Sequence, residues 1–130
     1  MDAVPDRPPP ALPPGFRIGA ASSALQVEGA ADVGGRGSSI WDGVLGRDGT
    51  SGLDGAHHHG RYVEDVALLR DLGVRDYRFS ISWPRVVPHG RGLPSAAGLD
   101  FYDRLVDELC AAGIAPMATL YQWDLPLTLE

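Results

Sequence analysis

Apolar residues recur along this 130-residue chain with two alternating spacings, one typical of helices and one typical of strands. The helical spacing predicts a helix over 61–72, which Gly73 ends, and a second helix over 99–109, which Gly113 ends. Before, between and after them, shorter segments have the character of strands. Strands that alternate with helices of this length pair in parallel through right-handed crossovers, so the pattern predicts an α/β fold.

Three segments carry the strand character. Residues 16–24 mix apolar and small side chains, and residues 74–82 alternate apolar with polar ones. Residues 114–121 form a nearly continuous apolar run, which predicts a strand buried on both faces. Residues 125–130 then resemble the start of a further connection. Because a three-stranded parallel sheet leaves its outer strands uncovered, we expect the chain to stop part-way through a larger fold.

Two segments have neither spacing. Residues 1–14 are rich in proline, which predicts an extended, disordered leader ahead of a single folded domain over 15–130. Residues 31–60 are dominated by Gly, Ser and Asp and predict a long loop. Loops of this length are often functional or disordered.

Composition and charge exclude several classes of function. The net charge is −6, and all 11 positive residues are arginines that form no basic cluster, so nucleic acid is not an expected partner. No apolar run reaches the roughly 18 residues that span a membrane. The N-terminus lacks the basic start and apolar core of a secretory signal, so we expect a cytoplasmic protein without a membrane partner. Cys110, the single cysteine, lies within a helical pattern and is expected to be buried.

Polar and aromatic side chains follow the first and third predicted strands and lie at the end of the second, at the edge where parallel α/β folds bind ligands. Amides donate and accept hydrogen bonds as sugar hydroxyls do, and an indole face packs on the C–H surface of a sugar ring, so the mixture suits a carbohydrate. Composition alone favours a plainer interpretation, in which the tryptophans pack and the amides satisfy loop backbone. The residues are Gln26, Glu28, Arg78, Ser80, Ser82, Trp83, Gln122, Trp123 and Asp124.

Five blocks of sequence shift this balance. They are 16–30, 39–42, 77–85, 98–107 and 119–126, and they run from Phe16-Arg-Ile-Gly to Gln122-Trp-Asp-Leu-Pro126. In content and order they resemble glycoside hydrolase family 1, the β-glucosidase family. Several ordered blocks over more than a hundred residues are far more specific than one short motif.

The resemblance implies a (β/α)8 barrel, of which the chain would hold the first three strands and two helices. Family members hydrolyse β-glycosides with retention, using one glutamate as acid and base and a second as nucleophile. None of the four glutamates here, Glu28 included, stands in the family's Asn-Glu-Pro or Glu-Asn-Gly context. No catalytic residue is therefore expected within these residues, and the resemblance implies no cofactor.

The resemblance also implies binding roles. Gln26 corresponds to a residue that hydrogen bonds the sugar beside the cleaved bond, with Trp123 supporting the same ring. Arg78 corresponds to the arginine that pairs with the nucleophile and keeps it ionised, although an ordinary salt bridge in the barrel interior is an equal alternative. Gln122 stands where the family usually has histidine, and it keeps a donor and an acceptor but no titratable proton. Trp41 and Asp42 are expected to shape the first long loop rather than to touch sugar.

Other readings of the sequence are weaker or remain open. His57, His58 and His59 are adjacent, so they cannot all face one ion on a regular backbone, and no metal site is expected. The long loop after the first strand argues against a doubly wound nucleotide-binding domain. Two hypotheses remain: part of a retaining β-glycosidase acting on β-glucosides or oligosaccharides, or a catalytically silent product that binds sugar weakly or complements another barrel fragment. In either case we expect the 130 residues alone to be inactive, and the oligomeric state stays open.

Overall fold

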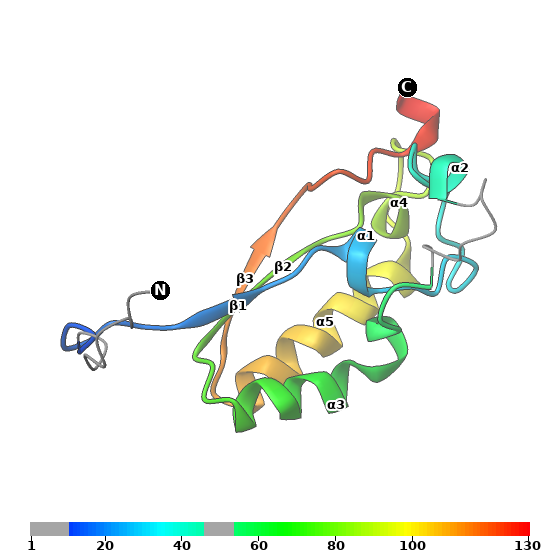
Figure 1. The fold of residues 1–130 in the computed structure, drawn as a ribbon. Coiled ribbons are helices and arrows are strands. Elements are labelled where there is room, and N and C mark those ends of the chain that lie inside the picture. Colours follow the sequence, from blue (N-terminus) through cyan, green and yellow to red (C-terminus); the bar gives the residue numbers. More distant parts are fainter. Residues whose placement is uncertain (1–10, 46–53) are drawn as a thin grey trace, which may run out of the picture.

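The computed structural model describes residues 11–45 and 54–130. Strands and helices alternate, with three short helices and a final turn added at the strand ends (Figure 1). The elements are β1 Gly19–Ala21, α1 Ala24–Val27, α2 Asp42–Leu45, α3 His58–Asp71, β2 Asp76–Ser80, α4 Trp83–Val86, α5 Ala96–Ala111, β3 Ala115–Thr119 and the 3-10 helix η1 Leu127–Leu129. Within the described residues no helix is both long and apolar enough to cross a membrane.

The three strands form one parallel sheet in the order β1-β2-β3. The register sets Ala21 beside Arg78 and Arg78 beside Met117, while Ser80 lies beside Thr119. The predicted α/β class and the parallel pairing are confirmed. Because neighbouring parallel strands point the same way, their carboxyl ends meet at one edge, together with α1, α4 and the turn after β3 (Figure 1).

Local chemistry explains where the two long helices begin and end. The Ser95 hydroxyl accepts a hydrogen bond from the Gly98 backbone N–H at 3.2 Å and caps α5. Each long helix is followed by a glycine with positive φ, Gly73 at 75° and Gly113 at 73°. These glycines turn the chain from helix into strand, as predicted, because left-handed backbone carries no steric cost in glycine.

The core lies between the sheet and the long helices, which pack side by side on one face (Figure 1). Aromatic rings from β2 and α5 dominate it, and Leu105 and Leu109 are at most 1% exposed. Burial of large apolar side chains is the main favourable term in such packing. The buried cluster comprises Val66, Tyr77, Phe79, Phe101, Tyr102, Leu105, Leu109 and Ile114.

Two burial predictions are wrong. The strand over 114–121 was expected to be buried on both faces, but in β3 the side chains of 115–118 are exposed, and Met117 is 56% exposed. Among the described residues β3 pairs only with β2, so it is an edge strand with little covering its faces. Cys110 is exposed rather than buried. It follows Leu109, the innermost residue of α5, and one helical step of about 100° turns it out of the core.

Several boundaries also differ. The strand predicted over 16–24 is paired only at Gly19–Ala21, because the chain turns into α1 directly afterwards. α4 was not predicted. It begins at Trp83, and Pro84 follows in the first turn, where proline is tolerated in a helix. The loop predicted over 31–60 contains α2 and the start of α3, and its residues 46–53 lie outside the described part, as does most of the predicted leader.

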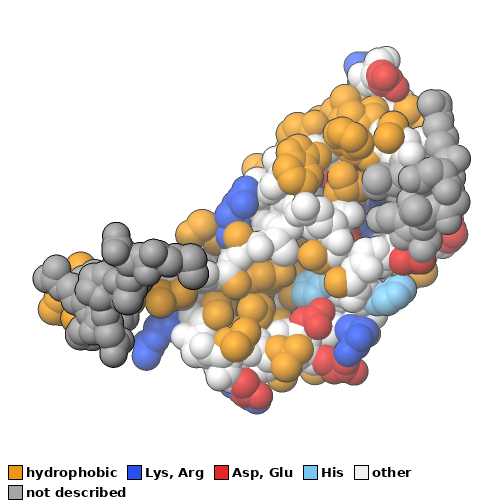
Figure 2. Space-filling model, viewed as in Figure 1, with side chains coloured by type: hydrophobic (Ala, Val, Ile, Leu, Met, Phe, Trp, Pro, Cys, Tyr) orange, Lys and Arg blue, Asp and Glu red, His pale blue; other side chains and the backbone are white. Residues whose placement is uncertain are grey.

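Apolar surface remains exposed beside β3 and beside α3. A groove of about 530 Å³ runs along β3, lined by side chains that include Phe79, Ile81 and Leu120, and a smaller one of about 250 Å³ lies against α3 near Tyr77. Figure 2 shows apolar side chains gathered over the middle of the molecule and again towards the end that carries the C-terminus.

Candidate functional site

Arg78, in the middle of β2, joins this strand to the end of β3 and to the turn after it. Its Nε donates a hydrogen bond to Thr119 Oγ1 at 3.0 Å, and one terminal nitrogen donates to Gln122 Oε1 at 2.9 Å. Arg78 and Gln122, two residues singled out from the sequence, are therefore brought together at the carboxyl edge of the sheet. Within 11–45 and 54–130 no carboxylate forms an ion pair with Arg78, so the alternative of an ordinary salt bridge finds no partner there.

Gln26 lies on α1 at the same edge and is exposed. Its Oε1 accepts a hydrogen bond from Ser23 Oγ at 2.7 Å, which orients the amide from the residue before the helix. Ser23 is itself buried, and the backbone N–H of Ala24 donates to Ser80 Oγ at 2.7 Å. α1 is thereby fixed to the end of β2, and the Gln26 amide projects from a rigid base.

Trp123 occupies a strained turn after β3. Its φ is 74°, in the left-handed region that bulky residues rarely adopt. The Asp124 backbone N–H donates a hydrogen bond to the Gln122 backbone carbonyl at 3.0 Å, which closes a three-residue turn around Trp123. Trp123 is 48% exposed, so its indole is available to a ligand.

The sequence pattern predicted Asp124 at the same edge of the sheet, but its side chain is buried inside the protein. The residue is 1% exposed, and neither carboxylate oxygen has a hydrogen-bond partner among the described residues. Burial raises the pKa of Asp124 to about 6; Ser82 approaches and opposes the rise, but the contact falls short of a hydrogen bond. The location of Asp124 behind the turn could not be foreseen from the local sequence pattern.

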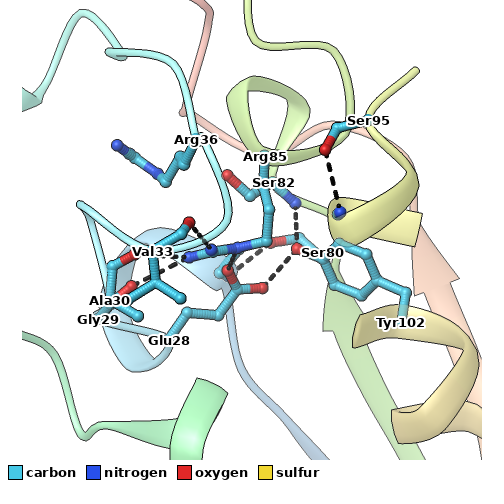
Figure 3. Close-up of polar contacts among 12 residues, drawn as sticks. Glu28, Gly29, Ala30, Val33, Arg36, Ser80, Ser82, Arg85, Ser95 and Tyr102 are labelled. Atoms are coloured by element: carbon cyan, nitrogen blue, oxygen red, sulfur yellow. Dashed lines mark hydrogen bonds and ion pairs between the residues drawn. The ribbon is translucent and has the colours of Figure 1, made fainter. Parts of the chain in front are cut away.

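A buried polar network joins the segment after α1 to α4 and α5 (Figure 3). Arg85 Nε donates to Glu28 Oε2 at 2.9 Å, and Tyr102 donates its hydroxyl proton to Glu28 Oε1 at 2.5 Å. Tyr102 in turn accepts from the Ser82 N–H at 2.6 Å, and Arg85 donates to the Gly29 carbonyl at 3.0 Å. In the sequence, Glu28 stood out only by its position after the first predicted strand. In the structure it forms a buried ion pair with Arg85, which suits a structural carboxylate rather than a reacting one.

The first long loop is shaped by a second ion pair. Arg36 contacts both oxygens of Asp42, at 2.7 and 3.0 Å, and Ser39 donates to Asp42 from its backbone N–H and its hydroxyl. Burial opposes ionisation of Asp42, but these hydrogen bonds outweigh it and lower the pKa of the carboxyl. The expectation that Asp42 shapes this loop agrees with these contacts.

The three adjacent histidines have separate surroundings. His57 precedes α3 in a left-handed conformation, with φ 58°. His58 is buried, with its Nδ1 2.7 Å from Asp65 Oδ2. His59 stacks on Phe101 with ring centroids 4.3 Å apart, and burial lowers the pKa of His59 to about 4. In the described ranges no group of three or more His, Cys, Asp or Glu side chains could hold a metal ion.

Comparison with known proteins identifies related sequences over nearly the whole chain. The family model described as Glycosyl hydrolase family 1 matches residues 9–130. Thermostable beta-glucosidase B of Thermobispora bispora is 52% identical over 125 residues, covering 92% of this chain and 26% of the relative. The chain thus spans about a quarter of the length of this relative.

Solved structures agree with this relationship. The virulence factor SghA of Agrobacterium tumefaciens, in complex with its substrate analog salicin, is 48% identical with a TM-score of 0.79, covering 88% of this chain and 26% of that one. A beta-glucosidase from Thermotoga maritima, in complex with castanospermine, is 43% identical with a TM-score of 0.82, covering 91% of this chain and 28% of that one. The three parallel strands and their helices align with part of each structure.

Proposed function

Because the chain belongs to glycosyl hydrolase family 1, we propose that its residues form the part of a retaining β-glucosidase barrel that holds the sugar beside the cleaved bond. The observation that carries this proposal is the hydrogen bond from Arg78 to Gln122 at the carboxyl edge of the sheet. This bond brings a cation and an amide to the edge where barrel enzymes bind substrate. Gln26 and Trp123 project from the same edge on elements that are separately fixed.

Each of these residues has a part that suits a sugar. The amides of Gln26 and Gln122 can donate to and accept from neighbouring hydroxyls, and the exposed Trp123 indole offers an apolar face to the C–H side of the ring. None of these interactions requires a metal or a cofactor. They would bind and orient a terminal β-glucoside, while the described residues supply no reacting carboxylate pair.

Arg78 has hydrogen-bonding capacity to spare. A guanidinium has five N–H donors, and the bonds to Thr119 and Gln122 use two of them. The remaining donors suit a carboxylate on a neighbouring strand of a barrel, whose pKa an adjacent arginine would lower so that it stays ionised for attack. We assign that carboxylate, and the acid that protonates the leaving group, to barrel residues beyond these 130.

The glutamates of this chain do not suit the reaction themselves. A retaining mechanism needs two carboxyl groups roughly 5 Å apart on opposite sides of the glycosidic bond. Glu28 is buried in its pair with Arg85, and Glu64 pairs with Arg61 on the exposed surface of α3. We therefore propose that the 130 residues alone bind sugar at most weakly and hydrolyse nothing.

An exchange experiment tests the proposal. In the exchange barrel, residues 9–130 of this chain replace the matching segment of the Thermobispora bispora enzyme, whose identity of 52% favours compatible packing. We expect the exchange barrel to release glucose from salicin, and the 130-residue chain to release none. An exchange barrel that unfolds cooperatively but releases no glucose would contradict the proposed function.

A further inference from the structure

Trp41 and Trp123 are linked although 82 residues separate them. The Trp41 indole Nε1 donates a hydrogen bond to the Trp123 backbone carbonyl at 2.8 Å. Trp41 precedes α2 in the first long loop, whereas Trp123 lies in the turn after β3. The contact therefore joins the two loops that flank the carboxyl edge of the sheet.

The backbone that receives this bond is strained. Trp123 has a left-handed φ of 74°, and such a conformation persists in a bulky residue only when its surroundings fix it. The Trp123 carbonyl also accepts from the Leu125 N–H at 3.0 Å, so the Trp41 indole supplies its second donor. A carbonyl oxygen has two lone pairs, and both are used here.

The loop that presents Trp41 is itself firmly held. The Ile40 N–H donates to the Leu125 carbonyl at 3.0 Å, and the Leu127 N–H donates to the Ser38 carbonyl at 2.8 Å. Asp42, next to Trp41, accepts hydrogen bonds from both Arg36 and Ser39. The Trp41 indole N–H therefore extends from a backbone segment that hydrogen bonds hold in place.

From these contacts we infer that Trp41 is a positioning residue for the sugar site. Its indole N–H fixes the Trp123 turn, and through it the orientation of the Trp123 ring and the Gln122 amide, without touching sugar itself. This inference rests on the proposed function, because it needs Trp123 and Gln122 to face the ligand. It goes further because it assigns the Trp41 indole N–H, in the first long loop, the role of holding the turn that contains Trp123.

Two substitutions in the exchange barrel separate the hydrogen bond from the bulk of the ring. Trp41→Phe keeps an aromatic ring and removes the N–H. Trp41→His loses the six-membered ring but can keep an N–H at the equivalent position of its five-membered ring. The probe is castanospermine, measured by calorimetry, so that binding is observed without turnover.

We expect Trp41→Phe to weaken castanospermine binding by about threefold to tenfold, the effect of one net hydrogen bond. Trp41→His should recover most of that loss. If unsubstituted exchange barrel binds castanospermine and Trp41→Phe binds it equally well, the inference is overturned while the proposed function stands. If Trp41→His binds as weakly as Trp41→Phe, ring volume and not the N–H is responsible, which also overturns it. An exchange barrel that folds but binds no castanospermine overturns the proposed function, and with it the inference.

A second measurement needs no sugar. In ¹⁵N spectra of the exchange barrel, the indole signal that disappears in Trp41→Phe identifies the Trp41 N–H. Because this N–H is hydrogen bonded, we expect it to exchange with D₂O more slowly than the indole of N-acetyltryptophanamide. Equal exchange rates would mean that the bond does not hold the turn, and the inference would fail.

Discussion

Tyr102 donates its hydroxyl proton to Glu28 from a position 74 residues away, and the same carboxylate accepts from Arg85. The three side chains join the segment after α1 to α4 and α5. Burial and the neighbouring Glu28 charge raise the pKa of Tyr102 well above its ordinary value, so the phenol keeps the proton that it donates. This network fixes the C-terminal end of α1, the helix that carries Gln26.

Glu28→Ala should destabilise the fold strongly. Arg85 is only 2% exposed, and removing its carboxylate leaves a buried charge without its ion-pair partner, which typically costs about 3–5 kcal/mol. The urea unfolding midpoint of the exchange barrel measures this loss. Asp100→Ala is the matched control, since Asp100 pairs with Arg104 on the surface of α5 and such pairs contribute about 1 kcal/mol or less. Equal losses in the two variants would contradict a structural role for the buried pair.

Asp124→Asn should stabilise the protein at neutral pH and have little effect in acid. The folded-state pKa is raised from 3.8 to about 6, so the folded protein binds the Asp124 proton more tightly than the unfolded chain does. The Asp124 contribution to stability therefore falls as pH rises from about 4 to about 6, and reaches a penalty of about 3 kcal/mol above that range.

His59 changes the stability in the opposite direction over a similar pH range. Burial favours its neutral form in the folded state and lowers its pKa, so its contribution to stability rises with pH. The measurement is therefore made on the exchange barrel with and without Asp124→Asn. It is the difference between their unfolding free energies, taken from pH 4 to pH 8. We expect this difference to grow in favour of the variant up to about pH 6 and then to level off. A difference that is constant with pH would show that Asp124 does not titrate as described.

Arg78→Ala should impair hydrolysis in the exchange barrel far more than it impairs folding. The substitution removes the donors to Thr119 and Gln122 and the cation proposed to keep the nucleophile ionised. We expect kcat/KM for salicin to fall by about a hundredfold or more, the scale of a lost charged interaction of roughly 3 kcal/mol. Arg70→Ala, which removes an exposed arginine of α3, is the matched control and should leave kcat/KM unchanged. Similar kinetics for the two variants would exclude the role assigned to Arg78.

The 130-residue chain should self-associate when expressed alone. The groove along β3 exposes apolar side chains, and β3 has an unpaired edge among the described residues. Leu120→Lys, a change within this groove at a residue that is 79% exposed, should reduce association in sedimentation velocity. Leu93→Lys is the control, because Leu93 is also exposed but does not line the groove. A soluble monomer with a sharp thermal transition would contradict this prediction.

Local spacing in the sequence predicted the long helices, the three strands and their parallel pairing. Gly73 and Gly113 marked the helix ends because a left-handed backbone turn has a local signature. The positions of Arg78, Gln122 and Trp123 at one edge followed from the rule that the carboxyl ends of parallel strands meet. These features depend on neighbours along the chain or on a general rule of topology.

Other features depend on contacts between distant residues and leave no local signature. Glu28 and Arg85 are 57 positions apart, and no spacing in the sequence indicates that they pair. The bond from Trp41 to Trp123 and the burial of Asp124 are of the same kind. The exposure of Met117 escaped prediction because an apolar strand pattern does not report how many neighbouring strands cover it.

Gln26→Ala removes one of the side chains proposed to hold the sugar. Gln26 is exposed at the edge of the sheet and contributes little packing, so its loss should leave the fold intact. The measurement is a calorimetric titration of castanospermine into the exchange barrel with and without this substitution. We expect binding about tenfold weaker in the variant, the effect of a lost ligand hydrogen bond. Unchanged affinity in a folded variant would contradict this expectation.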